Sequence, residues 1–159
     1  MSAESFGEEI LRKMKESGQL YHRLVLVVGR PGSGKTTVLQ NVKALTGAPL
    51  INVNLELSKR MLDLTERQRC LQIPRLLDEI VKEAASEVLL LDNLEILFDV
   101  NLLQDPLRLL QGMSRNRTVV ATWNGSIENN RLVYAAPEHP EYRKYPVIDL
   151  LTVIVEKVE

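Results

Sequence analysis

Cysteine, aromatic residues and net charge are all scarce in this chain. It has one cysteine in 159 residues, 4% aromatic residues and a formal net charge of −1. A single cysteine excludes an internal disulfide, and a balanced charge argues against a strongly basic surface, so we expect DNA to be at most an indirect partner. No segment approaches the roughly 18 apolar residues that a membrane span needs, and residues 1–10 show no signal-peptide pattern. These absences predict a cytoplasmic protein that has no membrane partner.

One glycine-rich segment stands out against this background. Residues 24–37 read LVLVVGRPGSGKTT, in which an apolar run leads into the pattern G-x-x-x-x-G-K-T. In this pattern backbone N–H groups surround a phosphate, the lysine reaches the β- and γ-phosphates, and the threonine hydroxyl binds Mg²⁺. The helix that follows directs its positive end at the anion. The pattern predicts a nucleotide site made of Gly29, Arg30, Pro31, Gly32, Ser33, Gly34, Lys35, Thr36 and Thr37.

The expected nucleotide is ATP. A guanine-specific switch would show N-K-x-D for the base and D-x-x-G after the metal aspartate. The chain has neither motif, because Glu95 stands at the position of that glycine. We therefore expect ATP and Mg²⁺ as ligands, with Lys35 acting in catalysis.

Apolar periodicity predicts alternating strands and helices. After a leading helix within residues 1–20, strands are expected at 24–28, 50–53, 88–91 and 118–123, and helices at 35–46, 56–64, 73–85 and 102–113. Such alternation is typical of a parallel sheet with helices on both faces. We predict an α/β fold, a P-loop NTPase three-layer α/β/α sandwich with a mainly parallel sheet, as a single domain over 1–159 without a separate lid. Residues 136–159 are expected to form a loop and a β-rich extension.

Metal binding is expected at the carboxyl ends of the strands, where parallel α/β sheets hold their ligands. Asp92 directly follows the apolar run 88–91, and Gly29 follows the run 24–28. A carboxylate at that edge can hold Mg²⁺ or its water ligands together with the Thr36 hydroxyl. We predict Thr36 and Asp92 as metal residues; the alternative is that a strand simply ends on a polar residue.

Hydrolysis also requires a group that orients or deprotonates water. Asn93 stands where many P-loop ATPases carry a glutamate, and the next carboxylate is Glu95. If a helix begins after Asp92, Glu95 shares a face with Asp92 at i, i+3 and can act as the base; otherwise it is a solvated carboxylate at a helix start. Asn93 is a weaker, water-orienting candidate.

Thr122 and Asn124 lie at the expected end of the fourth strand. Either side chain can bind the γ-phosphate or the attacking water, and either can instead cap a turn, since Asn124 and Gly125 together form a turn signal. Phosphoryl transfer often needs an arginine as well. The candidates stay unranked: Arg115, Arg117, Arg131 and Arg143.

The phosphate loop, Asp92 and the polar end of the fourth strand together resemble the core of AAA+ and related ATPases. The chain departs from that pattern in two respects. Asn93 replaces the usual glutamate, and the chain is too short for the helical lid that normally follows the fifth strand.

Over nearly its full length the chain more closely resembles the BrxF family, the small P-loop proteins of type 3 BREX (bacteriophage exclusion) systems. The distinctive segments are NVNLELSKRMLDLTERQR at 52–69, LLLDNLEILFD at 89–99 and TWNGSIENNRLVYAAPEHPEYRKYP at 122–146. This resemblance implies a role in antiphage defence, with other BREX proteins, namely a larger ATPase and a DNA methyltransferase, as partners.

Three functions stay open at this point. The first is an ATPase whose nucleotide state controls assembly with BREX proteins or as a homo-oligomer, since a second copy can complete a site that lacks a lid. The second is a small-molecule P-loop kinase. The third is an ATP-binding module with little or no hydrolysis, which Asn93 makes plausible.

Overall fold

The fold is known from a computed structural model that describes residues 1–136 and 138–158. The helices are α1 Ala3–Ser17, α2 Lys35–Thr46, α3 Val53–Met61, α4 Glu66–Ala84 and α5 Pro106–Met113, with short 3-10 helices η1 Glu95–Phe98 and η2 Val100–Leu102. The strands are β1 Leu24–Gly29, β2 Leu50–Asn52, β3 Val88–Asp92, β4 Thr118–Glu128, β5 Arg131–Tyr134, β6 Arg143–Pro146 and β7 Leu151–Ile154.

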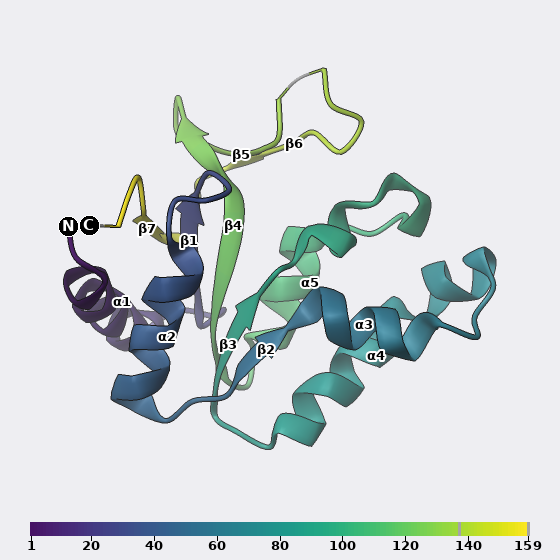
Figure 1. The fold of residues 1–159 in the computed structure, drawn as a ribbon, viewed down its shortest axis with the longest axis horizontal. Coiled ribbons are helices and arrows are strands. Elements are labelled where there is room, and N and C mark those ends of the chain that lie inside the picture. The colour runs from purple at the N-terminus through teal and green to yellow at the C-terminus, as the bar shows by residue number, and fades with distance from the viewer. Residues whose placement is uncertain (137, 159) are drawn as a thin grey trace.

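Five of these strands form a parallel sheet in the order β2-β3-β4-β1-β7. The end of β4 leaves this sheet and pairs antiparallel with β5, which in turn pairs antiparallel with β6. Figure 1 shows α1 and α2 on one side of the parallel strands and α3, α4 and α5 on the other, with β5 and β6 beyond the end of β4. The mainly parallel sheet covered on both faces confirms the predicted α/β fold.

The core is divided by the sheet into two apolar clusters. All six residues of β1 are buried, and their side chains alternate: Leu24, Leu26 and Val28 join the cluster on the α3–α5 side. Val25 and Val27 join the cluster on the α1 and α2 side. A strand buried on both faces is typical of the centre of a parallel sheet, and it fixes the position at which the phosphate loop begins.

Two helices begin earlier than the apolar periodicity predicts. α3 begins at Val53 because the Asn52 side chain caps it, accepting from the Leu55 N–H at 3.0 Å. α4 begins at Glu66, where Thr65 and Gln68 cap each other's backbone in a capping box. In both cases a polar capping residue, rather than the first apolar one, determines where the helix starts.

The segment after β3 and the end of β4 also differ from the prediction. The expected helix 102–113 is shorter: η2 ends at Leu102, and α5 begins only at Pro106, where the Asp105 side chain caps it. β4 continues through Asn124 to Glu128, and its turn lies at Asn129 and Asn130, which have φ of 52° and 59°. Asn124 therefore does not cap a turn.

The range 136–159, predicted as a loop and a β-rich extension, contains the strands β6 and β7. β6 Arg143–Pro146 forms within it and extends the antiparallel strands. Pro137 and Glu159, which belong to the predicted extension 136–159, lie outside the described residues. Within the described parts of the chain, no helix has the length and apolar character required to span a membrane.

Candidate functional site

The phosphate loop joins β1 to α2 in a backbone conformation that needs glycine. Gly32 and Gly34 have φ of 82° and 101°, a region that residues with a Cβ rarely adopt. Gly34 is also the N-cap of α2 and supplies no side chain to the first N–H groups of that helix. Those N–H groups stay available for an anion, as the sequence pattern requires.

Lys35 is 6% exposed, and its ammonium group lies inside the loop. The Nζ donates to the carbonyl oxygens of Gly29 and Arg30, each at 2.8 Å. Burial lowers the pKa of Lys35, and the negative charges of Asp92 and Glu95 act in the opposite direction. Lys35 lines the same pocket as Asp92 and Glu95.

Asp92 is the best-connected carboxylate of the site. Its Oδ2 accepts from the Thr36 hydroxyl at 2.6 Å, and its Oδ1 accepts from the Thr122 hydroxyl at 2.8 Å and from the Asn93 N–H at 2.9 Å. These donors come from α2, β4 and the residue after β3, so three parts of the fold fix one carboxylate. Thr122 is 4% exposed, and its hydroxyl is occupied by this bond to Asp92.

The Thr36 hydroxyl and the Asp92 carboxylate fit Mg²⁺. Both are hard oxygen donors, and Mg²⁺ in nucleotide sites is bound by one or two such protein groups together with phosphate oxygens and water. No cluster of three or more His, Cys, Asp and Glu side chains suited to a metal occurs in residues 1–136 and 138–158. The donor set therefore suits a metal shared with a nucleotide better than one held by protein alone.

Glu95 is brought to the site by a route other than the expected helix. Asn93 has a left-handed backbone with φ 55°, and a 3-10 helix begins at Glu95 itself. The Glu95 carboxylate accepts from Asn54 Nδ2 at 2.9 Å and from Asn124 Nδ2 at 2.5 Å. It is therefore neither a freely solvated carboxylate nor part of an α-helix that follows Asp92.

Asn54 is a site residue that the sequence reasoning missed. Its side-chain oxygen accepts from the Ile96 N–H at 2.8 Å, and its backbone N–H donates to the Asn93 carbonyl oxygen at 2.9 Å. It thereby holds both ends of the turn that carries Glu95. The available signal was a polar residue close behind the second strand, at the same edge of the sheet as Asp92.

Nine of the predicted site residues line one pocket of about 340 Å³, here called the phosphate pocket, whereas Gly29, Arg30, Ser33 and Thr122 are not part of its lining. Its lining includes Lys35 and Thr36 from α2, Asp92 and Asn93 after the third strand, and Glu95 and Asn124, together with Pro31, Gly32 and Gly34 of the loop. Thr37 is exposed on α2 and is not part of this lining.

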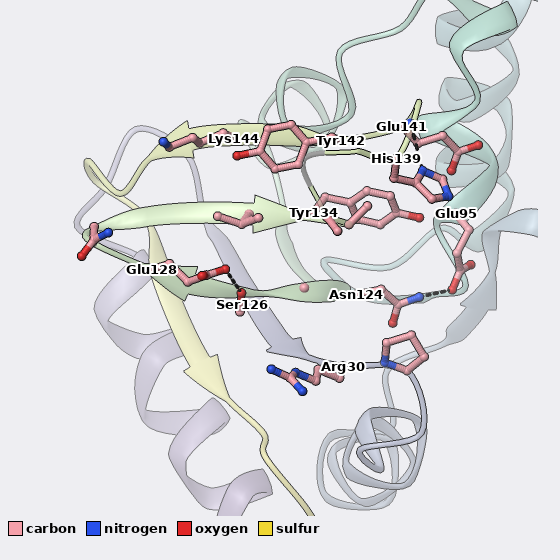
Figure 2. Close-up of a pocket in the computed structure, with 16 residues that line it drawn as sticks. Arg30, Glu95, Asn124, Ser126, Glu128, Tyr134, His139, Glu141, Tyr142 and Lys144 are labelled. Carbon is pink, nitrogen blue, oxygen red and sulfur yellow. Dashed lines mark hydrogen bonds between the residues drawn. The ribbon is translucent and has the colours of Figure 1, made fainter.

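A larger cavity of about 680 Å³ opens beside this pocket and shares Pro31, Glu95 and Asn124 with it. It lies between the phosphate loop and the antiparallel strands β4, β5 and β6. Figure 2 shows Tyr134 and Glu95 at one end of this cavity and Lys144 at the other, with Arg30 below β4. The exposed Arg30 side chain thus faces this cavity, whereas its backbone carbonyl binds Lys35.

The four candidate arginines lie elsewhere. Arg115 stacks over the Tyr21 ring at 5.0 Å, Arg117 donates to two backbone carbonyls at 3.4 Å, and Arg143 donates to the Gln104 carbonyl oxygen at 3.0 Å. Arg131 is exposed at the start of β5. These four are not among the residues that line the phosphate pocket, so none is placed to act on a phosphate in the same chain.

Comparisons with known proteins bear on this arrangement. Residues 25–130 match the model of the AAA family, described as the ATPase family associated with various cellular activities. None of the curated proteins matches the chain. Among solved structures, the chain is similar to one described as "Structure of C. elegans PCH-2", with a TM-score of 0.49 and 14% identity. That likeness covers 96% of this chain and 42% of the other, so the present chain spans less than half of its length.

Proposed function

Because the chain belongs to the AAA family of ATPases, we propose that it binds ATP with Mg²⁺ at residues 29–36 and hydrolyses it. The observation that carries this proposal is the Asp92 carboxylate, bonded to the Thr36 and Thr122 hydroxyls in the pocket that contains Lys35. A phosphate-binding lysine and a metal-binding carboxylate in one pocket are the two parts that phosphoryl transfer from ATP requires.

Each residue has a distinct part in the proposed reaction. Lys35 and the N–H groups at the start of α2 hold the phosphates, and Thr36 and Asp92 would hold Mg²⁺. When bound, the metal neutralises negative charge on the phosphate oxygens. Glu95 is the base that takes a proton from water, and Asn124 orients that carboxylate through its amide. Asn54 fixes the turn that presents Glu95.

The biological setting we propose is a type 3 BREX antiphage system. The segments 52–69, 89–99 and 122–146, which resemble the BrxF family, support this proposal. In that setting the nucleotide state controls assembly of the protein with itself or with a larger ATPase and a DNA methyltransferase of the same system. DNA is then an indirect partner, and the protein acts in the cytoplasm.

The first experiment replaces the phosphate-binding lysine. Lys35→Ala is expected to abolish ATP binding, phosphate release and phage protection, because the other cation of the loop, Arg30, is exposed on the larger cavity and does not line the phosphate pocket. Lys43→Ala, at an exposed position of the same helix, is the matched control and should behave as the native chain. Undiminished protection with Lys35→Ala would contradict the proposed role.

A second experiment tests the assembly step. The molecular mass of the protein in solution is measured with and without ATP and Mg²⁺, and a change of mass on addition of nucleotide would support nucleotide-controlled assembly.

A small-molecule kinase is the second candidate, and the larger cavity favours it. A cavity of about 680 Å³ that shares Glu95 and Asn124 with the phosphate pocket could hold a phosphoryl acceptor beside the γ-phosphate. The two functions differ in the fate of the phosphate. Transfer of labelled γ-phosphate to an added metabolite would favour the kinase, and release of inorganic phosphate without any acceptor would count against it.

A further inference from the structure

Residues 155–158, here called the strap, connect the edge of the sheet to the phosphate loop. They follow β7, which pairs with β1 at the edge of the parallel sheet, as Figure 1 shows. The Val155 N–H donates to the Val28 carbonyl oxygen at 2.7 Å, and the Val158 N–H donates to the Ser33 carbonyl oxygen at 3.1 Å. The strap is thus hydrogen-bonded both to the last residues of β1 and to the loop itself.

Two of the loop glycines pack directly against the strap. A Cβ at Gly34 would lie 2.5 Å from Val158 Cγ2, and a Cβ at Gly29 would lie 2.4 Å from the Val155 carbonyl oxygen. At Gly32 the same position has no neighbouring atom within 4 Å. The strap therefore contacts the loop at Gly29 and Gly34, the two ends of its glycine pattern, and does not contact Gly32 between them.

These contacts reach the groups that would bind phosphate. Gly34 is the N-cap of α2, and the N–H groups that follow it are those expected to surround the anion. Ser33, whose carbonyl accepts from the strap, also has its hydroxyl 3.5 Å from Lys35 Nζ. A shift of the strap would therefore move the backbone that directs the phosphate-binding N–H groups and a partner of the lysine.

We propose that the strap positions the phosphate loop, so that ATP binding and docking of the strap stabilise each other. The inference rests on the proposed function, because it takes ATP as the ligand of the loop. Val158 is a positioning residue: it contacts Gly34, not the nucleotide. Coupling between two sites is reciprocal, so ATP must hold the strap in place as strongly as the strap favours ATP.

The first test uses the native chain and needs no variant. Hydrogen exchange of the Val155 and Val158 amides is measured by NMR with and without ATP and Mg²⁺. We expect exchange of both to slow by about fivefold or more on binding. The β6 amides, which lie away from the strap, serve as the control and should change less.

The second test removes the contact between Val158 and Gly34. Val158→Ala should raise the KM for ATP by about fivefold while kcat changes little, because the strap acts on loop conformation and not on chemistry. Val158→Ile, which keeps a branched side chain at this position, should have the native KM. Ile154→Ala, at a β7 position that is 50% exposed, is the matched control.

The outcomes separate the strap from the proposed function. If the native chain binds ATP but the strap amides exchange unchanged and Val158→Ala keeps the native KM, the strap proposal alone is overturned. A lowered melting temperature of Val158→Ala with an unchanged KM would overturn it as well, because Val158 would then act only in packing. If the native chain binds no ATP, both proposals fail.

Discussion

The parallel sheet and the antiparallel extension, residues 125–146, hold their polar side chains in different ways. At the carboxyl ends of the parallel strands, the Asp92 carboxylate accepts from the Thr36 hydroxyl at 2.6 Å and from the Thr122 hydroxyl at 2.8 Å. In the extension, Glu128 accepts from the Ser126 hydroxyl of its own strand, and Glu128, Glu141 and Lys144 line the larger cavity. The packing there is aromatic instead, with Tyr134 stacked on Phe98 at 3.5 Å between ring centroids. The sheet provides a pre-organised site, whereas the extension provides a wall beside it.

The largest expected effect comes from removing the charge at the centre of the sheet's site. Asp92→Asn keeps the shape of the side chain but not the carboxylate that would hold the metal. We expect ATP turnover to fall by about 10³-fold, since metal stabilisation of phosphoryl transfer is worth several kcal/mol. Phosphate release measures this effect, and Asp63→Ala, at an exposed position, is the control. A fall of less than tenfold would mean that Asp92 only ends the strand.

Substitutions of Glu95 and Glu141 compare a carboxylate of the proposed site with a carboxylate of the extension. Both carboxylates border the larger cavity, but only Glu95 also borders the phosphate pocket. Glu95→Gln should lower turnover by about 10²-fold or more, the usual contribution of a general base. Glu141→Gln should leave phosphate release unchanged. If Glu95→Gln has native turnover, the base assignment is wrong; if no variant or native chain shows turnover, the ATP-binding module is favoured.

Gly125 tests the extension as a structural unit. A Cβ at this position would lie 1.8 Å from the Val133 carbonyl oxygen, so Gly125→Ala must separate β4 from β5. We expect a loss of about 2 kcal/mol in the free energy of unfolding, typical of overpacking. Gly112→Ala is the matched control: nothing lies within 4 Å of its added methyl, and alanine favours the helix α5, so stability should rise slightly. Chemical denaturation compares them, and equal stability of the two variants would contradict the close β4–β5 approach.

The smallest expected effect is on the titration of Tyr134. Burial raises its pKa from 10.0 to about 12, with the charges of Glu141 and Glu95 acting in the same direction. Above pH 10 the unfolded chain loses this proton while the folded chain keeps it. The contribution of Tyr134 to stability is therefore complete below pH 10 and is lost as the pH rises to 12. Ultraviolet titration of the native chain and of Tyr134→Phe should differ by one late-titrating phenol; a difference near pH 10 would contradict the burial.

The sequence predicts the sheet's site better than the extension, and the physical reason is the range of the interactions. The loop conformation is encoded by its own glycines, and Asp92 is placed by the apolar run before it. The meeting of Asn54 with Glu95 depends instead on how α3 packs against the turn after β3, which no local pattern contains. At Asn124 and Gly125 the local turn signal gave a wrong prediction, because Asn124 pairs with Gly29 of β1 and Gly125 pairs with Tyr134 of β5, which keeps both residues in a strand.

The spacing of two side chains on β4 affects the spacing of the two site carboxylates. Thr122 and Asn124 are two residues apart on one continuous strand, so they share a face and their Cα atoms are about 6.7 Å apart. Thr122 donates to Asp92 at the end of β3, and Asn124 donates to Glu95 at the start of η1, so one strand contacts the two carboxylates that lie on either side of Asn93. The spacing of the proposed metal-binding group and the proposed base is therefore set by β4 together with the turn at Asn93.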